Sequence, residues 1–261
     1  MKILAIHGSM RKGNTYALTQ EILRRLAAKP EVEITEISAA EQDLPFCQSC
    51  HTCFIKGEEF CPHDAVTREI RAALMECDGI ILSGVAYMWS LNAAMKNLLD
   101  HFAYLFHRPA LFGKYGMAVA TAAGMGEKNV AQYLRTVLGQ WGINGAMLVT
   151  QNEKSKSLGS GEKAAAKLDQ AADRFYHKIR AKRLISPGLK NLVVHNAFRA
   201  MSLSGYSGSE RDTAYWRDSG LGGTTYPTKT GPLKRCAGAL IYHAASGMTK
   251  AAGRAYTKKQ K

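Results

Sequence analysis

The sequence lacks any long uninterrupted apolar segment. Its longest apolar stretches fall far short of the ~20 residues that a membrane-spanning helix needs, and the apolar run after Met1 is too brief for the hydrophobic part of a signal peptide. Internal repeats and low-complexity stretches are also absent. With 261 residues, of which 46% are hydrophobic, the chain can bury a full core. We therefore expect a soluble globular protein of the cytoplasm.

Acidic residues are scarce in the last third of the chain. Residues 180–261 contain 15 Lys and Arg but only 3 Asp and Glu, whereas residues 1–179 contain 20 and 18. A basic tail can attract nucleic acid, anionic lipid, an acidic protein surface or a phosphorylated nucleotide, or it can be a solvated terminus. No zinc-finger or ribonucleoprotein-type motif accompanies the basic tail, so we expect no nucleic-acid partner.

The sequence also lacks the two common phosphate-binding motifs, the dinucleotide fingerprint and the Walker loop. Residues 8–15 nevertheless form a different candidate phosphate-binding loop. They follow the apolar run Ile3 to Ile6 and lead directly into a helical pattern. The spacing of Gly8 and Gly13 fits neither the dinucleotide fingerprint nor a Walker loop. The side chains that can contact an anion are those of Ser9, Arg11, Asn14 and Thr15. Together with the free N–H groups of a helix N-terminus they predict a phosphate site, and the alternative is an ordinary helix cap.

Strand and helix patterns alternate through the first 181 residues. We expect strands at 3–7, 32–37, 79–83, 116–121 and 146–150, and helices at 14–28, 65–76, 90–102, 128–140 and 162–181. Such alternation predicts an α/β fold with a doubly wound parallel sheet and helices on both faces. In such sheets a ligand binds beyond the carboxyl ends of the strands.

Three loops leave the carboxyl ends of predicted strands, namely residues 8–15, 84–90 and 121–126. The second is aromatic and apolar, and the third is rich in glycine and small residues. Combined with a phosphate loop, they predict a site for a phosphate joined to a flat ring. Taken singly, Tyr87 and Trp89 could instead serve core or surface packing.

These loops resemble those of the flavodoxin-like NAD(P)H-dependent FMN reductase family, including its quinone reductase and iron-sulfur flavoprotein branches. The resemblance covers residues 1 to about 180. The matching positions are Gly8, Ser9, Arg11, Gly13, Asn14, Thr15, Tyr87 through Ser90, Ala94, Lys96, Leu99, Asp100 and the loop 121–126. Two positions depart from the family's pattern: Val85 stands where proline is usual, and His101 stands where arginine is frequent.

The resemblance implies a five-stranded flavodoxin-like sheet of order 2-1-3-4-5 that binds FMN. It implies hydride transfer from NAD(P)H to FMN and then electron transfer to a quinone, flavin or similar acceptor, in a homodimer or homotetramer. It assigns no certain catalytic side chain, and Tyr87 is the best candidate beside the ring. The implied cofactor-binding residues are Ser9, Arg11, Gly13, Asn14, Thr15, Val85, Ala86, Tyr87, Met88, Trp89, Ser90, Thr121, Ala122, Ala123 and Gly124.

Four cysteines cluster in one connection, as Cys47-x2-Cys50-x2-Cys53-x7-Cys61-Pro62. Clustered thiols without an export signal favour metal or redox chemistry over disulfides. The motif resembles that of the iron-sulfur flavoprotein branch, which implies a [4Fe-4S] cluster that feeds electrons to FMN. Thiols without metal, or a zinc site completed by histidine, are the alternatives. Cys77 and Cys236, outside the motif, are expected to be buried.

Ser186-Pro187-Gly188 marks a break in the chain. It divides an FMN-binding domain, residues 1–185 with a cysteine-rich insert at 45–64, from a basic extension, residues 186–261. The extension contains predicted helices at 189–203 and 233–256, with a Gly/Ser-rich connection and a Gly/Thr/Pro-rich stretch between them. Leu233, Leu240, Ile241 and Met248 predict one apolar stripe on the last helix, for which a clasp within the chain or between subunits is favoured over membrane binding.

Two other functions stay open at this stage. One is an electron carrier in which the iron-sulfur cluster, rather than nicotinamide, supplies electrons to the FMN. The other is a flavodoxin-like binding module without catalysis. The basic tail would attract the extra phosphate of NADPH, but the choice between NADH and NADPH is not readable from the sequence.

Overall fold

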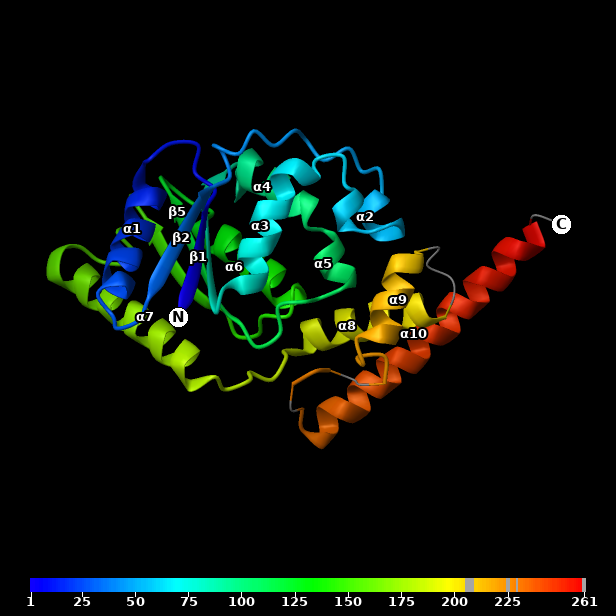
Figure 1. The fold of residues 1–261 in the computed structure, drawn as a ribbon. Helices are drawn as coiled ribbons and strands as arrows, with labels where there is room; N and C mark the ends of the chain where they lie inside the picture. The colour runs from blue at the N-terminus through cyan, green and yellow to red at the C-terminus, as the bar shows by residue number, and fades with distance from the viewer. Residues whose placement is uncertain (205–208, 224–225, 229, 260–261) are drawn as a thin grey trace.

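The computed structural model describes residues 1–204, 209–223, 226–228 and 230–259, and its centre is a twisted parallel sheet (Figure 1). The parallel strands are β1 (Lys2–His7), β2 (Glu33–Ser38), β3 (Gly79–Tyr87), β5 (Tyr115–Ala122) and β6 (Met147–Asn152). Their order is β2-β1-β3-β5-β6. This is the predicted flavodoxin-like α/β arrangement, which is confirmed. Within the described ranges, no helix has the length and apolar character needed to cross a membrane.

Helices cover both faces of the sheet. Alternate residues of each strand point to opposite faces, so each strand contributes apolar side chains to two separate core clusters. Ile3 and Ala5 of β1 belong to one core cluster, and Leu4 and Ile6 belong to the other. The first cluster is covered by α1 (Asn14–Ala27) and α7 (Gly161–Ala181), which lie together on the left in Figure 1. The second is covered by α3 (Asp64–Glu76), α4 (Ala93–His101), α5 (Tyr104–His107) and α6 (Glu127–Gln140). Burial on both faces explains the continuous apolar runs in the strands.

The segment at 84–90 differs from the prediction of a plain loop followed by a helix. β3 continues to Tyr87 and turns back into a short antiparallel strand, β4 (Ser90–Leu91). The helix predicted from residue 90 therefore begins only at Ala93. The physical reason is a two-residue turn, Met88-Trp89, which lets the two strands pair.

The cysteine-rich insert contains two short helical turns, α2 (Thr52–Ile55) and the 3-10 helix η1 (Glu58–Phe60). His51, just before α2, has left-handed backbone angles, with φ of 59°. The rest of the insert has no regular structure, so its conformation depends on contacts with other elements.

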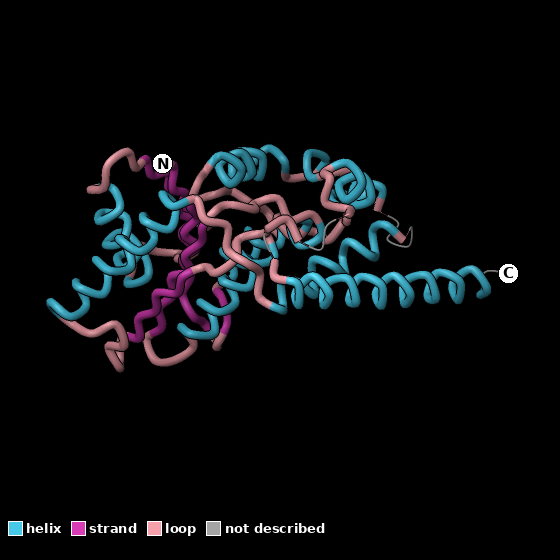
Figure 2. Tube along the Cα trace, turned by 90° about the horizontal axis from the view of Figure 1, so that it is seen from below, coloured by secondary structure: helices cyan, strands magenta, loops and turns pink. Residues whose placement is uncertain are grey.

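Three helices form the C-terminal extension: α8 (Leu189–Leu203), α9 (Glu210–Asp218) and α10 (Pro232–Lys259). The sequence predicted α8 and α10 but missed α9, which begins after Ser209, whose side chain accepts a hydrogen bond from the N–H of Asp212. α10 packs along α8 and then projects away from the sheet as a long rod (Figure 2). Parts of the two predicted glycine-rich connections, at 205–208, 224–225 and 229, lie outside the described residues. The division at residue 185 stays a prediction.

Candidate functional site

The three predicted loops meet at the carboxyl edge of the sheet. The hydroxyl oxygens of Thr15 and Thr121 lie 2.6 Å apart in a hydrogen bond that joins the first loop to the third. The side-chain N–H of Asn92, just after β4, donates to the carbonyl of Gly8 and joins the first loop to the second. A Cβ added to Gly126 would lie 3.3 Å from the Cα of Trp89, so the second and third loops are also in contact. The sequence prediction that these loops adjoin is therefore reproduced in the structure.

The first loop has the donor set of an anion site. α1 begins at Asn14 with Gly13 as its cap, no side chain caps it, and its first turn contains no acidic residue. Its leading N–H groups therefore face outward with a partial positive charge, and the exposed Arg11 lies beside them. Gly8 lets the loop approach β3 closely, because a Cβ there would come within 2.7 Å of the carbonyl oxygen of Ser83. These features fit a phosphate group.

The second loop is a strained hairpin that presents large side chains to solvent. Met88 and Trp89 have φ of 49° and 65°, a left-handed conformation that glycine or asparagine usually occupies in such turns. A non-glycine residue there costs roughly 1–2 kcal/mol. Tyr87, Met88 and Trp89 are 52%, 95% and 59% exposed. Strain combined with exposed ring and thioether groups is typical of a ligand-contacting segment, and these groups fit the face of a flat ring.

The third loop is open on its outer side. Thr121 and Ala122 are buried at the end of β5, whereas Ala123, Gly124 and Met125 are exposed. Asn152, buried at the end of the neighbouring β6, donates to the carbonyl of Gly124 and to the carboxylate of Glu127. Sequence reasoning missed Asn92 and Asn152 as loop supports, although each is a polar residue at a strand end.

The remaining predicted cofactor residues are distributed over the same edge. Among the predicted set, those that are buried are Thr15, Thr121 and Ala122, those half-buried are Ser9, Gly13, Val85 and Ala86, and those exposed are Arg11, Asn14, Tyr87, Met88, Trp89, Ser90, Ala123 and Gly124. Their assignment to a cofactor stays a prediction.

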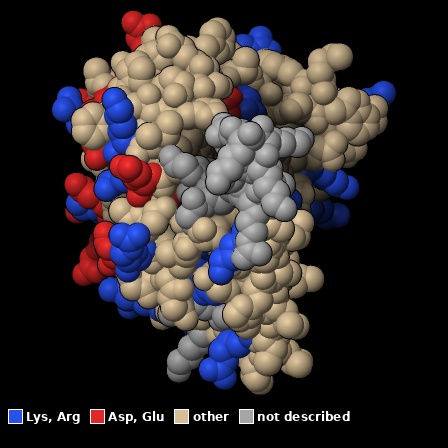
Figure 3. Space-filling view, turned by 90° about the vertical axis from the view of Figure 1, so that its right-hand side faces the viewer, with Lys and Arg blue, Asp and Glu red and all other residues tan. Residues whose placement is uncertain are grey.

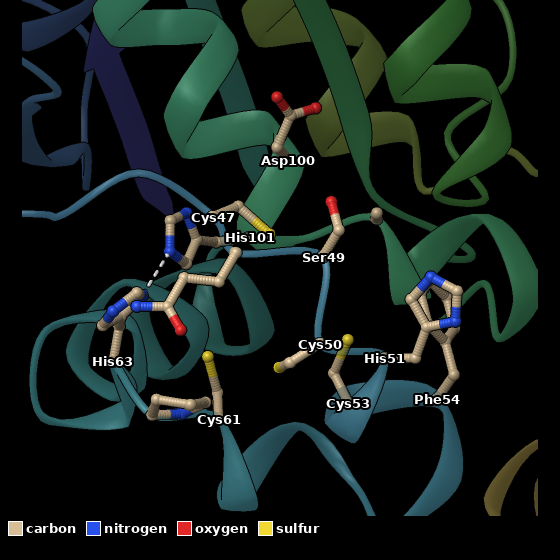
Figure 4. A pocket seen from close by; sticks show the side chains of 13 residues that line it. Cys47, Ser49, Cys50, His51, Cys53, Phe54, Cys61, His63, Asp100 and His101 are labelled. Atoms are coloured by element: carbon tan, nitrogen blue, oxygen red, sulfur yellow. Dashed lines mark hydrogen bonds between the residues drawn. The ribbon is translucent and has the colours of Figure 1, made fainter.

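The four clustered cysteines line a cavity of about 270 Å³. Figure 4 shows the sulfur atoms of Cys47, Cys50, Cys53 and Cys61 around the same central space. Within the described part of the chain, no three His, Cys, Asp or Glu side chains converge closely enough to hold one metal ion.

The four thiols have different environments. Burial raises the pKa of Cys53 to about 11, and burial also raises the pKa of Cys61. A hydrogen bond from the side chain of Thr52 lowers the pKa of the exposed Cys50. The direction of the pKa shift therefore differs between the exposed Cys50 and the more buried Cys53 and Cys61.

His101, where the resemblance leads one to expect arginine, faces this cavity. Its Nε2 lies 2.9 Å from Nδ1 of His63 (Figure 4). Its Nδ1 lies 2.9 Å from the carbonyl of Asn97. Its ring is buried, and burial lowers its pKa, which favours the neutral imidazole. Asn97 also accepts a hydrogen bond from the N–H of Cys47 at 3.1 Å, so α4 supports the cysteine loop directly.

The extension holds the other side of the cysteine loop. The Arg108 side chain is 4% exposed and donates to the carbonyl of Cys53 at 2.8 Å, to Glu58 at 2.7 Å and to Asp212 of α9. Asp212 also pairs with Nδ1 of His107 at 2.7 Å. Ser209 donates from its hydroxyl to the carbonyl of Phe54. Sequence reasoning missed this network, because its partners lie between 50 and 155 residues apart and have no common motif.

Comparison with known proteins supports the resemblance. The sequence model of a family described as NADPH-dependent FMN reductase matches residues 1–156. An iron-sulfur flavoprotein of Archaeoglobus fulgidus is 34% identical over 145 residues, which are 55% of this chain and 64% of that protein. Another iron-sulfur flavoprotein of the same organism is 28% identical over 118 residues, which are 44% of this chain and 53% of that protein. The chain thus spans less than two thirds of the length of either relative.

Solved structures show the same fold at low sequence identity. An NADH:FMN oxidoreductase in its apo form aligns with a TM-score of 0.52 and 23% identity, covering 73% of this chain and 92% of that one. An azoreductase from Bacillus anthracis aligns with a TM-score of 0.50 and 14% identity, covering 69% of this chain and 98% of that one. The sheet and its helices are therefore shared with these proteins.

Proposed function

The chain belongs to the NADPH-dependent FMN reductase family, and from this membership and the site geometry we propose that it is an FMN-dependent oxidoreductase. The observation that carries the proposal is the meeting of the three loops, held by the bond between Thr15 and Thr121. An anion site, an aromatic rim and an open glycine-rich loop then lie on one edge of the sheet, as a phosphate joined to a flat ring requires.

The residues of the chain have separate roles in this proposal. FMN supplies hydride and single-electron chemistry when it is bound. Arg11, Asn14 and the first N–H groups of α1 hold its phosphate. Tyr87, Met88 and Trp89 contact the ring. The backbone of residues 123–125 supplies donors at the polar edge of the ring, where negative charge develops on reduction.

We also propose that Cys47, Cys50, Cys53 and Cys61 hold an iron-sulfur cluster. The supporting observations are the four thiols around one cavity and the iron-sulfur flavoproteins among the relatives. Such a cluster supplies electrons one at a time. Asn97 and Arg108 hold the peptide groups of Cys47 and Cys53, so two of the four proposed ligands are fixed by hydrogen bonds to the body.

A nicotinamide donor is the second part of the proposal. The family to which the chain belongs is described as NADPH-dependent, and the exposed hairpin at Tyr87 to Trp89 leaves one side of the ring site open to a second substrate. A quinone, a flavin or a similar small molecule is the proposed acceptor, in the same open space.

Anaerobic purification tests these proposals together. We expect a flavin spectrum that NADPH bleaches, with iron and acid-labile sulfide in equal amounts. Cys50→Ser and Cys61→Ser should lose iron and sulfide but keep FMN, whereas Cys236→Ser, an exposed cysteine outside the cavity, should keep both. Bound FMN without iron or sulfide would refute the cluster alone. Failure to bind FMN at all would refute the oxidoreductase.

A further inference from the structure

The last helix, α10, exposes the apolar stripe that the sequence predicted as a clasp. Leu233, Leu240 and Met248 are 85%, 72% and 74% exposed. Their spacings of seven and eight residues place them on one side of a helix. These three side chains point to solvent and do not clasp the body in the described chain, whereas Ile241, the fourth residue of the predicted stripe, is half-buried.

The opposite side of α10 is the one that packs on α8. Gly238 and Thr249 are buried there, and the ring of Tyr242 lies 4.1 Å from the guanidinium of Arg199 in α8. Lys234 fixes the start of the helix by donating to Ser186 and to the carbonyl of Pro187. α10 is thus held by one face and the exposed stripe is left on the other. In Figure 2 the trace of α10 projects beyond the other described elements.

The charge of α10 has one sign. Its 28 residues include six Lys and Arg and no Asp or Glu. Arg235 and Lys250 are exposed. Figure 3 views the molecule from the end toward which α10 projects, and most acidic side chains visible there lie along the left side, whereas Lys and Arg also occur on the right. The exposed stripe is therefore accompanied by cations without neighbouring anions on its own helix.

We propose that α10 docks on an anionic lipid bilayer. Leu233, Leu240 and Met248 enter the boundary between headgroups and acyl chains, and the exposed Lys250 contacts the lipid phosphates. A second copy of the chain fits less well, because two copies of α10 would place like charges together. Nucleic acid offers no apolar surface for the stripe. At about 40 Å in length, the helix can lie in the plane of the interface.

Vesicle co-sedimentation with the complete chain tests the proposal. Phosphatidylcholine vesicles are compared with vesicles of equal parts phosphatidylcholine and phosphatidylglycerol. We expect binding to the anionic vesicles only, and weaker binding at higher salt. Replacing Lys250 by Glu should weaken binding at least fivefold, since each cation near an anionic surface contributes about fivefold. The control, Lys163→Glu, makes the same charge change on an exposed position of α7.

The apolar stripe is tested separately. Leu240→Gln with Met248→Gln should weaken binding to the anionic vesicles at least tenfold. Met75→Gln, a change at an exposed methionine of α3, should leave binding unchanged. Circular dichroism and FMN content confirm that each variant is folded, and neither readout depends on lipid.

Three results would overturn the proposal. The first is no binding to anionic vesicles at low salt. The second is an equal loss of binding in the control variants. The third is a dimer by sedimentation velocity that the Leu240 and Met248 changes dissociate without any vesicle binding, which would assign the stripe to a second copy.

Discussion

Replacing Asp212 by Asn should destabilise the protein strongly, because it removes the counter-charge of a buried cation. The side chains of Asp212 and Arg108 are 1% and 4% exposed. Breaking a buried ion pair by removing one partner typically costs 3–5 kcal/mol of unfolding free energy. Glu58 still pairs with Arg108 at 2.7 Å, and the new amide can still accept a hydrogen bond, so we expect the lower end, about 3 kcal/mol.

Urea unfolding measures this change. Asp218→Asn on the same helix is the matched control, since Asp218 is exposed, and its effect should stay within about 0.5 kcal/mol. A loss below about 1 kcal/mol for Asp212→Asn, or a loss no larger than that of the control, would refute the reasoning.

The same variant should also loosen the cysteine loop. Arg108 joins Asp212 to the carbonyl of Cys53. Because burial raises the pKa of the Cys53 thiol to about 11, this thiol is protonated at neutral pH. Without the pair, α9 holds the loop less firmly, and the Cys53 thiol becomes accessible. In metal-free protein, mass spectrometry should detect faster alkylation of Cys53 in Asp212→Asn than in Asp218→Asn, while the exposed Cys47 reacts equally in both. Equal rates at Cys53 would show that the extension does not control the loop.

Three further outcomes are expected. Arg11→Gln should weaken FMN binding about tenfold or more but leave riboflavin binding unchanged, because only FMN has the phosphate; fluorescence titration with Lys163→Gln as control checks this. Thr15→Val should cost about 1–3 kcal/mol of unfolding free energy by leaving the buried hydroxyl of Thr121 unpaired, and the double Val variant should cost less than the sum of the two single changes. Burial lowers the pKa of His195 to about 3, below its value of 6.5 in the unfolded chain. The neutral ring therefore contributes fully to the free energy of unfolding above pH 6.5, and this contribution is lost as the pH falls toward 3. His195→Phe should therefore remove about 1 kcal/mol per pH unit of the acid destabilisation seen by denaturant titration, and an unchanged slope would contradict the assignment.

Much of the fold could be predicted from local sequence. Strands buried on both faces give uninterrupted apolar runs such as Ile80 to Leu82, and the helices between them repeat their apolar residues at helical spacing. The β3–β4 hairpin could not be predicted, because Met88-Trp89 contains none of the glycine or asparagine that marks a two-residue turn. This departure from the usual turn residues occurs in the segment that we propose contacts the flavin ring.

Long-range pairing was the other limit. Arg108 and Asp212 are 104 residues apart, and neither has a sequence neighbour that indicates a buried partner. The direction of the α10 stripe was equally unreadable, since helical periodicity defines a face but not what that face meets. Cys236 illustrates the same point: it was expected to be buried and is exposed.

The contact between α9 and the cysteine loop bears on how the chain folds as a whole. The composition changes at Ser186 to Gly188, which suggests a place to cut the protein into two parts. A fragment that ended there would keep Arg108 but lose Asp212, and it would also uncover the carbonyl of His107 that the Trp216 side chain now contacts at 3.0 Å. We expect such a fragment to unfold more easily than the whole chain, and we expect the sheet and the extension of the whole chain to unfold in one cooperative transition despite their different compositions.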